Sequence, residues 1–198
     1  MKRIICLTAI VMLLVSNTFG QSDSLKETKN AFAPALLVID VQEEYMTWMS
    51  KGDQDLAIEM MNWAIWVFRQ NNLPVIRVYH TDPEWGPQEG TPNFEFHDSL
   101  KVMDSDPKFI KNYPSAFTKT ELDNYLKENE IKTLLLCGLS STGCVLATYF
   151  DAMAYDYKAF MVKDALLSHK ESYTDNIEEM FNALDLETIM YMLEVTKE

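Results

Sequence analysis

Three polar side chains in this sequence have the chemical types that a thiol nucleophile and its activating groups require. Cys144 carries a thiol, Asp40 a carboxylate that can take the thiol proton, and Lys111 a cation that favours the thiolate. Taken singly, each has an ordinary structural role, because an aspartate caps turns, a lysine is solvated and a cysteine fills a core. Together they predict nucleophilic thiol chemistry, provided that the fold brings them to one place.

Each of these residues lies near the end of, or shortly after, an apolar run of strand length. The runs are 35–41, 109–111 and 133–137. Continuous apolar runs are typical of strands buried on both faces of a parallel sheet. Because such sheets carry their sites at the carboxyl ends of the strands, the three side chains are expected to meet there.

The remaining periodicity predicts an α/β protein. Strands are expected at 35–41, 73–80, 109–111, 133–137, 159–162 and 188–192, and helices at 53–71, 142–155 and 173–184. A capping box at Thr118 and Glu121 predicts one more helix, which ends near residue 129. This alternation predicts a three-layer Rossmann-like fold, with a mostly parallel sheet and helices on both faces. The loop at 81–107 is long enough to be functional.

The helix expected at 53–71 has two further signals. Asp53 is a candidate N-cap residue. An apolar stripe at helical spacing, expected to face the core, consists of Leu56, Met60, Trp63 and Val67.

The motifs around the three chemical residues resemble those of the isochorismatase-like cysteine hydrolases, which include nicotinamidases, N-carbamoylsarcosine amidases and isochorismatases. Residues 138–145 resemble the family's Gly-x-x-Thr-x-x-Cys-Val turn, with Ser141 where Thr is common. Residues 39–42 resemble its Asp-x-Gln strand end, and 111–117 its Lys-x-x-x-Ser-Ala-Phe segment. A later Asp-Ala at 164–165 also matches, so the resemblance covers about residues 34 to 190.

The resemblance implies a mechanism and roles for named residues. Asp40 accepts the thiol proton, Lys111 orients its neighbours and lowers their pKa values, and Cys144 attacks an amide or related carbonyl to form a thioester. The backbone N–H groups of Ser140 and Cys144 form the oxyanion hole, and the Leu139–Ser140 peptide bond is cis. A homo-oligomer and a small-molecule substrate are implied as well.

Loops beside the expected strand ends supply candidate pocket residues. They are Gln42, Tyr45, Trp48, His80, Trp85, Tyr113 and Phe117. Nicotinamidases bind a metal through an Asp-x-His pair and another histidine, whereas this chain has only His80, His97 and His169 and no such pair. We therefore expect no catalytic metal and no other cofactor, and nicotinamide is a poor first guess for the substrate.

The N-terminal segment has the pattern of a cleaved secretory signal peptide. Lys2 and Arg3 precede an apolar run at 4–15, and small residues lead to an expected cleavage after Gly20. The predicted organisation is a signal peptide at 1–20, a polar leader at 21–33 and a hydrolase domain at 34–198. We expect a secreted or periplasmic protein that keeps no membrane anchor after cleavage.

Charge excludes one class of partner. The whole chain has 17 basic and 30 acidic residues and a net charge of −13. An acidic surface repels phosphate backbones, which argues against a nucleic acid partner.

Other functions fit the residues less well. The Gly-x-Ser-x-Gly elbow of serine hydrolases fails because Thr142 stands at its last position. A redox role for Cys137 and Cys144 lacks a Cys-x-x-Cys motif. The strongest rival is a catalytically inactive, exported small-molecule binding module with the same fold. An active enzyme is expected to carry a low-pKa, alkylation-sensitive Cys144.

Overall fold

A five-stranded parallel sheet forms the centre of the computed structural model, which describes residues 32–196. The predicted signal peptide and nearly all of the leader lie outside these residues. The spatial order is β3-β2-β1-β4-β5, and every pair is parallel. The strands are β1 (Pro34–Ile39), β2 (Val75–His80), β3 (Lys108–Lys111), β4 (Thr133–Leu139) and β5 (Lys158–Leu167). The predicted α/β class with a parallel sheet is confirmed.

The apolar run at the start of the domain becomes the central strand because both of its faces are covered. All six residues of β1 are buried. Leu36 and Val38 pack into the core on one side of the sheet, whereas Leu37 and Ile39 pack into the core on the other. This alternation explains why the run contains no polar position before Asp40.

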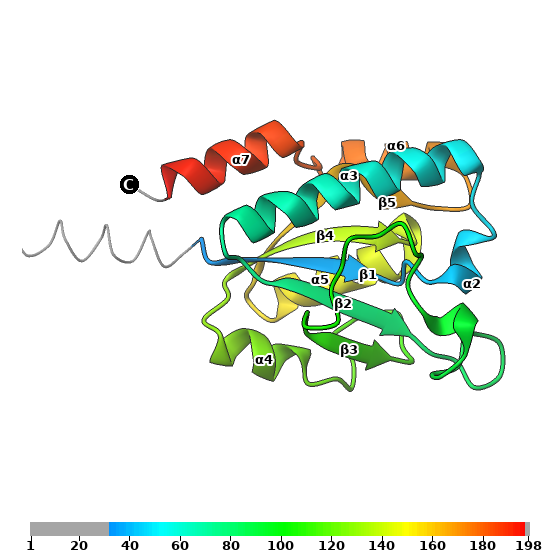
Figure 1. Ribbon diagram of the computed structural model, residues 1–198. Helices are drawn as coiled ribbons and strands as arrows, with labels where there is room; N and C mark the ends of the chain where they lie inside the picture. Colours follow the sequence, from blue (N-terminus) through cyan, green and yellow to red (C-terminus); the bar gives the residue numbers. More distant parts are fainter. Residues whose placement is uncertain (1–31, 197–198) are drawn as a thin grey trace, which may run out of the picture.

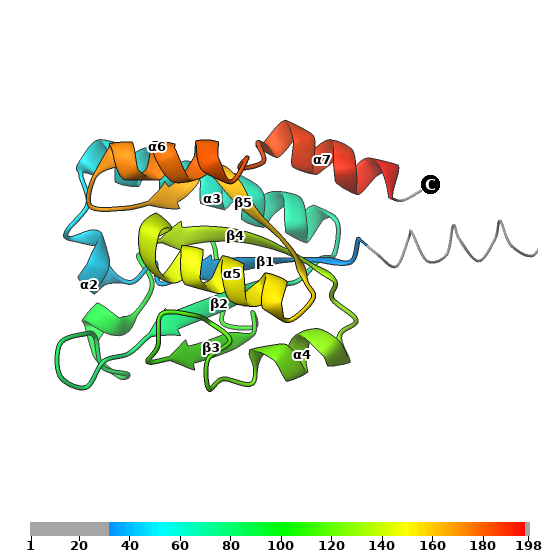
Figure 2. The same cartoon turned by 180° about the vertical axis from the view of Figure 1, so that it is seen from behind.

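Helices cover both faces of the sheet. On one face lie α3 (Lys51–Gln70) and α7 (Leu186–Val195), and on the other lie α4 (Leu122–Glu128) and α5 (Leu146–Ala154) (Figures 1 and 2). Helix α6 (Glu171–Met180) contacts β5, and the short helix α2 (Glu43–Met46) follows β1. The predicted three layers are therefore present. Within residues 32–196, no helix is both long and apolar enough to cross a membrane.

Helix α3 presents only part of the predicted stripe to the core, since Val67 is buried and Met60 packs against the core whereas Leu56 and Trp63 do not. Leu56 and Trp63 are 51% and 50% exposed, and the buried apolar residues are Ala57, Ile58, Met61, Ala64, Ile65, Val67 and Phe68. Small side chains allow the helix to approach the sheet closely, which leaves the bulkier indole outside. The N-cap is Ser50, whose Oγ accepts a hydrogen bond from the Asp53 N–H at 3.2 Å. Asp53 itself lies inside the helix.

One predicted strand and one predicted capping motif are wrong, although the helix that the motif was expected to open is present as α4. The strand expected at 188–192 is part of α7, which Asp185 caps by accepting from the Thr188 N–H at 2.7 Å. A short apolar run can belong to a buried strand or to a helix, so the hydrophobic pattern of residues 188–192 could not distinguish the two. The capping box also fails, because α4 begins at Leu122 and its N-cap residue, Glu121, makes no side-chain cap.

Candidate active site

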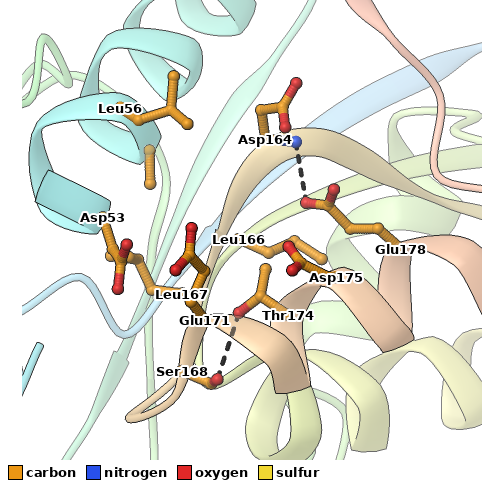
Figure 3. Close-up of a pocket in the computed structure, with 11 residues that line it drawn as sticks. Asp53, Leu56, Asp164, Leu166, Leu167, Ser168, Glu171, Thr174, Asp175 and Glu178 are labelled. Carbon is orange, nitrogen blue, oxygen red and sulfur yellow. Dashed lines mark hydrogen bonds between the residues drawn. The ribbon is translucent and has the colours of Figure 1, made fainter. Parts of the chain in front are cut away.

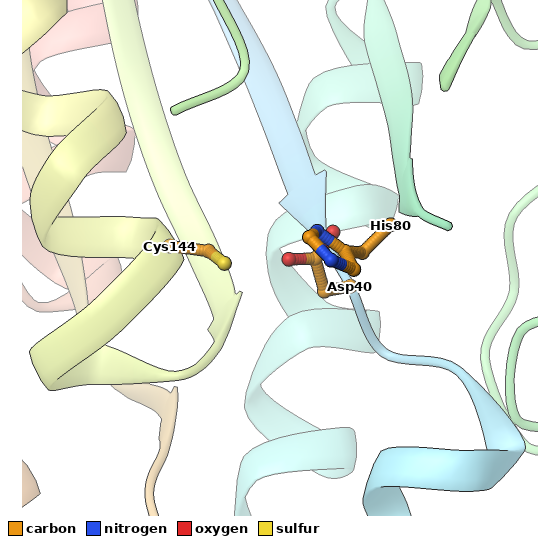
Figure 4. A group of neighbouring side chains, drawn as sticks. All are labelled: Asp40, His80 and Cys144. Carbon is orange, nitrogen blue, oxygen red and sulfur yellow. The ribbon is translucent and has the colours of Figure 1, made fainter. Parts of the chain in front are cut away.

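The predicted chemical residues gather at the carboxyl edge of the sheet. Asp40 follows β1, His80 ends β2, Lys111 ends β3 and Cys144 follows β4. His80 and Lys111 are direct partners in the β2–β3 register. Figure 4 shows the Cys144 side chain pointing from the turn before α5 toward Asp40 and His80 at the ends of their strands. Parallel pairing thus brings together residues that are up to about a hundred positions apart in the chain.

A buried ion pair lies at the centre of this group. Lys111 Nζ is 2.7 Å from Asp40 Oδ2, and the two side chains are 0% and 2% exposed. The same Nζ lies 3.1 Å from His80 Nδ1. Asp40 has a positive φ of 54°, which turns its side chain out of the strand direction. The sequence prediction that Asp40 and Lys111 act together agrees with this contact.

The other carboxylate oxygen of Asp40 takes no part in the ion pair. Asp40 Oδ1 is buried and has no hydrogen-bond partner among the described residues. A carboxylate oxygen of Asp40, a ring nitrogen of His80 and Cys144 Sγ all lie within 4.8 Å of one another. A buried acceptor without a partner is costly, so its retention next to a thiol is consistent with a functional role.

Burial changes the acid–base properties of this pair. It raises the pKa of Asp40, while the Lys111 cation acts in the opposite direction. Burial, and secondly the Asp40 carboxylate, also raise the pKa of Cys144 to about 12. The expectation of a low-pKa thiol is therefore wrong, because desolvation outweighs the cation. The thiol is protonated at rest and requires a base, and a carboxylate with a raised pKa is a stronger base than an ordinary one.

The nucleophile turn depends on close backbone approach. Gly138 has φ 110°, and a Cβ at this position would lie 2.1 Å from the Ile39 carbonyl oxygen. The Leu139–Ser140 peptide bond is cis, the geometry that the family resemblance implies. Residues Ser141–Val145 then form a turn into α5 that is kinked at Gly143, where φ is −122° and ψ is −106°. Only glycine lets β4 lie this close to β1, which fixes where the turn begins.

A cavity of about 270 Å³ opens beside Asp40, His80 and Cys144. Its lining consists of Asp40, Tyr45, Trp48, Met49, His80, Leu139, Ser140, Cys144 and His169. The Tyr45 ring is steeply inclined to both neighbouring rings, at 5.4 Å from Trp48 and 6.2 Å from His80 between centroids. Three predicted pocket residues, Tyr45, Trp48 and His80, thus lie at this cavity. Both predicted oxyanion residues, Ser140 and Cys144, line it as well.

Four other candidates do not line the cavity. Gln42 is fully buried, and its amide bonds the backbone N–H and carbonyl of His80. Phe117 stacks on Tyr155 in the core, at 5.1 Å between centroids. The remaining two are Tyr113, whose hydroxyl accepts from Lys119 Nζ at 2.6 Å, and Trp85, which is 86% exposed. These residues follow strand ends in sequence, but their side chains turn away from the cavity.

His169 lies in the pocket and was not predicted there from the sequence. It follows β5, which was expected to end at residue 162 and instead continues to Leu167. Polar residues at 163 and 164 hide this continuation, because they interrupt the apolar run. A longer strand would have placed His169 at the same carboxyl edge as the other residues.

The site does not fit the metal set of nicotinamidases. Within the described residues, the only group of three potential ligand side chains is Asp40, His80 and Cys144. Lys111 already donates to Asp40 and contacts His80 Nδ1, and its positive charge opposes a cation. We therefore derive no metal-dependent step.

A second, smaller cavity of about 60 Å³ has an acidic lining and lies between α3, β5 and α6 (Figure 3). Glu178 accepts a hydrogen bond from the Asp164 N–H at 2.8 Å, and Asp164 has a positive φ of 59°. Burial and the neighbouring Asp164 raise the pKa of Glu178 to about 7. The Asp-Ala motif thus lies in an irregular part of β5 and not beside Cys144.

Comparisons with known proteins agree with this geometry. A family model described as the isochorismatase domain matches residues 34–189. An uncharacterized isochorismatase family protein of Bacillus subtilis, YddQ, is 29% identical over 148 residues, which are 72% of this chain and 82% of that protein. A probable inactive nicotinamidase of Arabidopsis thaliana is 30% identical over 172 residues, with coverage of 75% and 88%. The crystal structure of N-carbamoylsarcosine amidase from Thermoplasma acidophilum matches with a TM-score of 0.67 at 28% identity, covering 78% of this chain and 95% of that one.

Proposed function

The chain belongs to the isochorismatase family of hydrolases, as its motifs predict, and we propose that it hydrolyses a small amide or related C–N bond with Cys144 as the nucleophile. One observation carries the proposal. Asp40 and Cys144 line the same cavity, with a carboxylate oxygen of Asp40 within 4.8 Å of Cys144 Sγ, while Lys111 holds Oδ2 at 2.7 Å and Oδ1 has no other partner among the described residues. A carboxylate that serves only a structural ion pair would not need a free oxygen beside a thiol.

The proposed reaction has two halves. Asp40 takes the thiol proton as Cys144 Sγ attacks the carbonyl carbon, and the backbone N–H groups of Ser140 and Cys144 stabilise the oxyanion. Asp40 then gives the proton to the leaving nitrogen, and the C–N bond breaks to leave a thioester. Water next attacks the thioester and passes one proton to Asp40. The C–S bond breaks, the acid leaves and the thiol recovers its proton.

The cavity supports a small, uncharged substrate. Aromatic and apolar side chains dominate its lining, and no Lys or Arg is among the described residues that line it. Lys111 is fully buried and already paired with Asp40, so it is not free to bind a substrate carboxylate. A volume of about 270 Å³ suits a small molecule. A known amidase among the similar structures, N-carbamoylsarcosine amidase, further supports cleavage of a C–N bond.

Ammonia release tests the proposal. We would incubate the protein with a panel of small amides, both neutral (acetamide, benzamide, pyrazinamide) and carboxylate-bearing (maleamate). Hydrolysis of a panel member by the wild type, together with its loss in Cys144→Ser and Asp40→Asn, supports the mechanism. An amide hydrolysed equally well by Cys144→Ser would contradict it. Cys137 is fully buried with a raised pKa, so Cys137→Ala is the matched control and should retain activity.

An inactive binding module is the second candidate function. It is favoured by the 30% identity to the Arabidopsis protein that is named a probable inactive nicotinamidase. In that case neutral amides would raise the unfolding temperature without releasing ammonia. Such a result would keep the cavity as a ligand site and remove the thioester from the mechanism.

We also propose that the protein is exported and forms a homo-oligomer. Lys2, Arg3 and the apolar run at 4–15 support export, and the family resemblance supports self-association. N-terminal sequencing should show that the mature protein begins at or near Gln21. Light scattering should give a mass above that of one chain. A retained Met1 in the cytoplasmic fraction would contradict export.

A further inference from the structure

His80 lies between the catalytic ion pair and the cavity. It ends β2, pairs in register with Lys111, and its Nδ1 is 3.1 Å from Lys111 Nζ. The same ring lines the cavity within reach of Asp40 and Cys144. Nothing in the proposed thiol mechanism uses this ring.

The contact with Lys111 determines the tautomer of His80. An ammonium group has three donors and no acceptor, so His80 Nδ1 must accept its hydrogen bond. The ring proton is then on Nε2, which leaves Nε2–H as a donor.

The charges around the ring keep it neutral. Burial lowers the pKa of His80, and the Lys111 cation lowers it further. The carboxylates of Asp40 and Asp82 act in the opposite direction and do not overcome these two effects. The other titratable side chains near the ring are Tyr45 and Cys144.

The backbone of His80 is held firmly in place. Its N–H donates to Gln42 Oε1 at 2.7 Å, and its carbonyl accepts from Gln42 Nε2 at 3.0 Å. Gln42 is fully buried and also donates to the Phe94 carbonyl at 2.8 Å. These bonds fix where the side chain starts, and the ring itself contacts Lys111 Nζ at 3.1 Å and the Tyr45 ring at 6.2 Å between centroids.

We propose that His80 is a positioning residue of the thiol site, whose Nδ1 holds Lys111 against Asp40 and whose Nε2–H is presented to the substrate in the cavity. This inference rests on the proposed function, because it assigns His80 a role in activating Cys144. Lys111 in turn holds Asp40 Oδ2 at 2.7 Å, which fixes the carboxylate within 4.8 Å of the thiol.

Two variants of similar shape, His80→Asn and His80→Leu, distinguish a hydrogen-bonding role of His80 from simple packing. His80→Asn keeps an acceptor close to the Nδ1 position and lacks the Nε2–H, whereas His80→Leu has nearly the shape of Asn and no polar atom. We would measure the rate of Cys144 alkylation by iodoacetamide at pH 7, located by peptide mass mapping, with folding checked by thermal unfolding. His80→Leu should react about fivefold to tenfold more slowly than wild type, the effect of one typical lost hydrogen bond. His80→Asn should recover a substantial part of that loss.

The outcomes are distinct. Equal rates in wild type and His80→Leu, or equally slow rates in His80→Leu and His80→Asn, would overturn the role of Nδ1 while leaving the thiol mechanism intact. A wild-type Cys144 that reacts no faster at pH 7 than that of Asp40→Asn would overturn the proposed function and this inference with it. If His80→Leu does not fold, His80→Gln replaces it, because its amide lies near the Nε2 position and away from Lys111.

Discussion

Lys111 Nζ lies 2.7 Å from Asp40 Oδ2 in a site where both side chains are almost completely removed from water. A buried pair of this kind contributes little net stability, because desolvation offsets the attraction. Its effect here is to neutralise one side of a carboxylate whose other oxygen has no partner among the described residues. Lys111 therefore opposes the rise that burial causes in the pKa of Asp40, although burial remains the larger effect.

Removing the cation should destabilise the fold in a pH-dependent way. Lys111→Met leaves Asp40 buried without its partner, which costs about 3–5 kcal/mol when the carboxyl is charged. The pKa of Asp40 would rise further above that of an unfolded aspartate, so the deficit should grow as the pH rises and be smaller at pH 5 than at pH 8. Urea unfolding at both pH values measures this. The double variant Asp40→Asn/Lys111→Met should recover most of the lost free energy of unfolding. A double variant as unstable as Lys111→Met would contradict the explanation.

Gly138 should tolerate no side chain. In Gly138→Ala the new Cβ would meet the Ile39 carbonyl at 2.1 Å with φ at 110°, so β4 and β1 must separate. We expect a loss of more than ~2 kcal/mol, seen as a fall of at least ~5 °C in the unfolding temperature. Gly52→Ala is the control, because a Cβ added there, in the first turn of α3, would meet no neighbouring atom within 4 Å. Equal unfolding temperatures for the two variants would contradict the close strand approach.

Glu178 gives a second pH dependence, outside the cavity that Cys144 lines. Its pKa is raised to about 7 in the folded protein from 4.5, so the folded state binds the proton more tightly and loses stability as the pH rises through that range. Glu178→Gln keeps the acceptor for the Asp164 N–H and removes the charge. It should raise the unfolding temperature by ~1–3 °C at pH 8 and leave it nearly unchanged at pH 5. A similar shift at both pH values would point to packing instead of ionisation.

The cavity should discriminate against a negative charge. Iodoacetamide and iodoacetate carry the same reactive carbon and differ in charge, so their rate ratio at Cys144 reports on the lining. Because Asp40 lines the cavity and no Lys or Arg is among the described residues that line it, we expect a ratio at least about tenfold above that of glutathione, used as the unstructured reference. A ratio equal to that of glutathione would remove the argument for an uncharged substrate.

The sequence predicts the parallel sheet and the residues at its carboxyl edge, because both depend on local apolar runs. The six buried residues of β1 include no polar side chain, so the sequence shows where this strand runs and where it ends. The face of α3 was predictable only in part, since Val67 of the predicted stripe is buried, whereas Ala57 and Ala64 give weak hydrophobic signals and are nevertheless buried against the core. Short residues allow close packing, a property that periodicity of hydropathy does not register.

Side-chain direction and burial were harder to predict than position. Gln42 and Phe117 follow strand ends, but one bonds the backbone of His80 and the other stacks in the core. The pKa of Cys144 is raised because of how much protein surrounds the thiol, and sequence gives no measure of that. Sequence identifies which residues can do the chemistry, whereas the structure determines their protonation at rest.

The most direct test of the thiol mechanism is the rate of Cys144 alkylation by iodoacetamide from pH 5 to pH 10, in wild type and in Asp40→Asn. Asparagine tolerates the positive φ of 54° at this position, so the variant should keep the backbone. If Asp40 takes the thiol proton, the wild-type rate should rise as Asp40 ionises and reach a plateau far below the thiol pKa of about 12. Asp40→Asn should lose this plateau, and its rate should fall about tenfold per pH unit below the pKa of its thiol. Profiles of the same shape in both proteins would contradict the assignment of Asp40 as the base that activates Cys144.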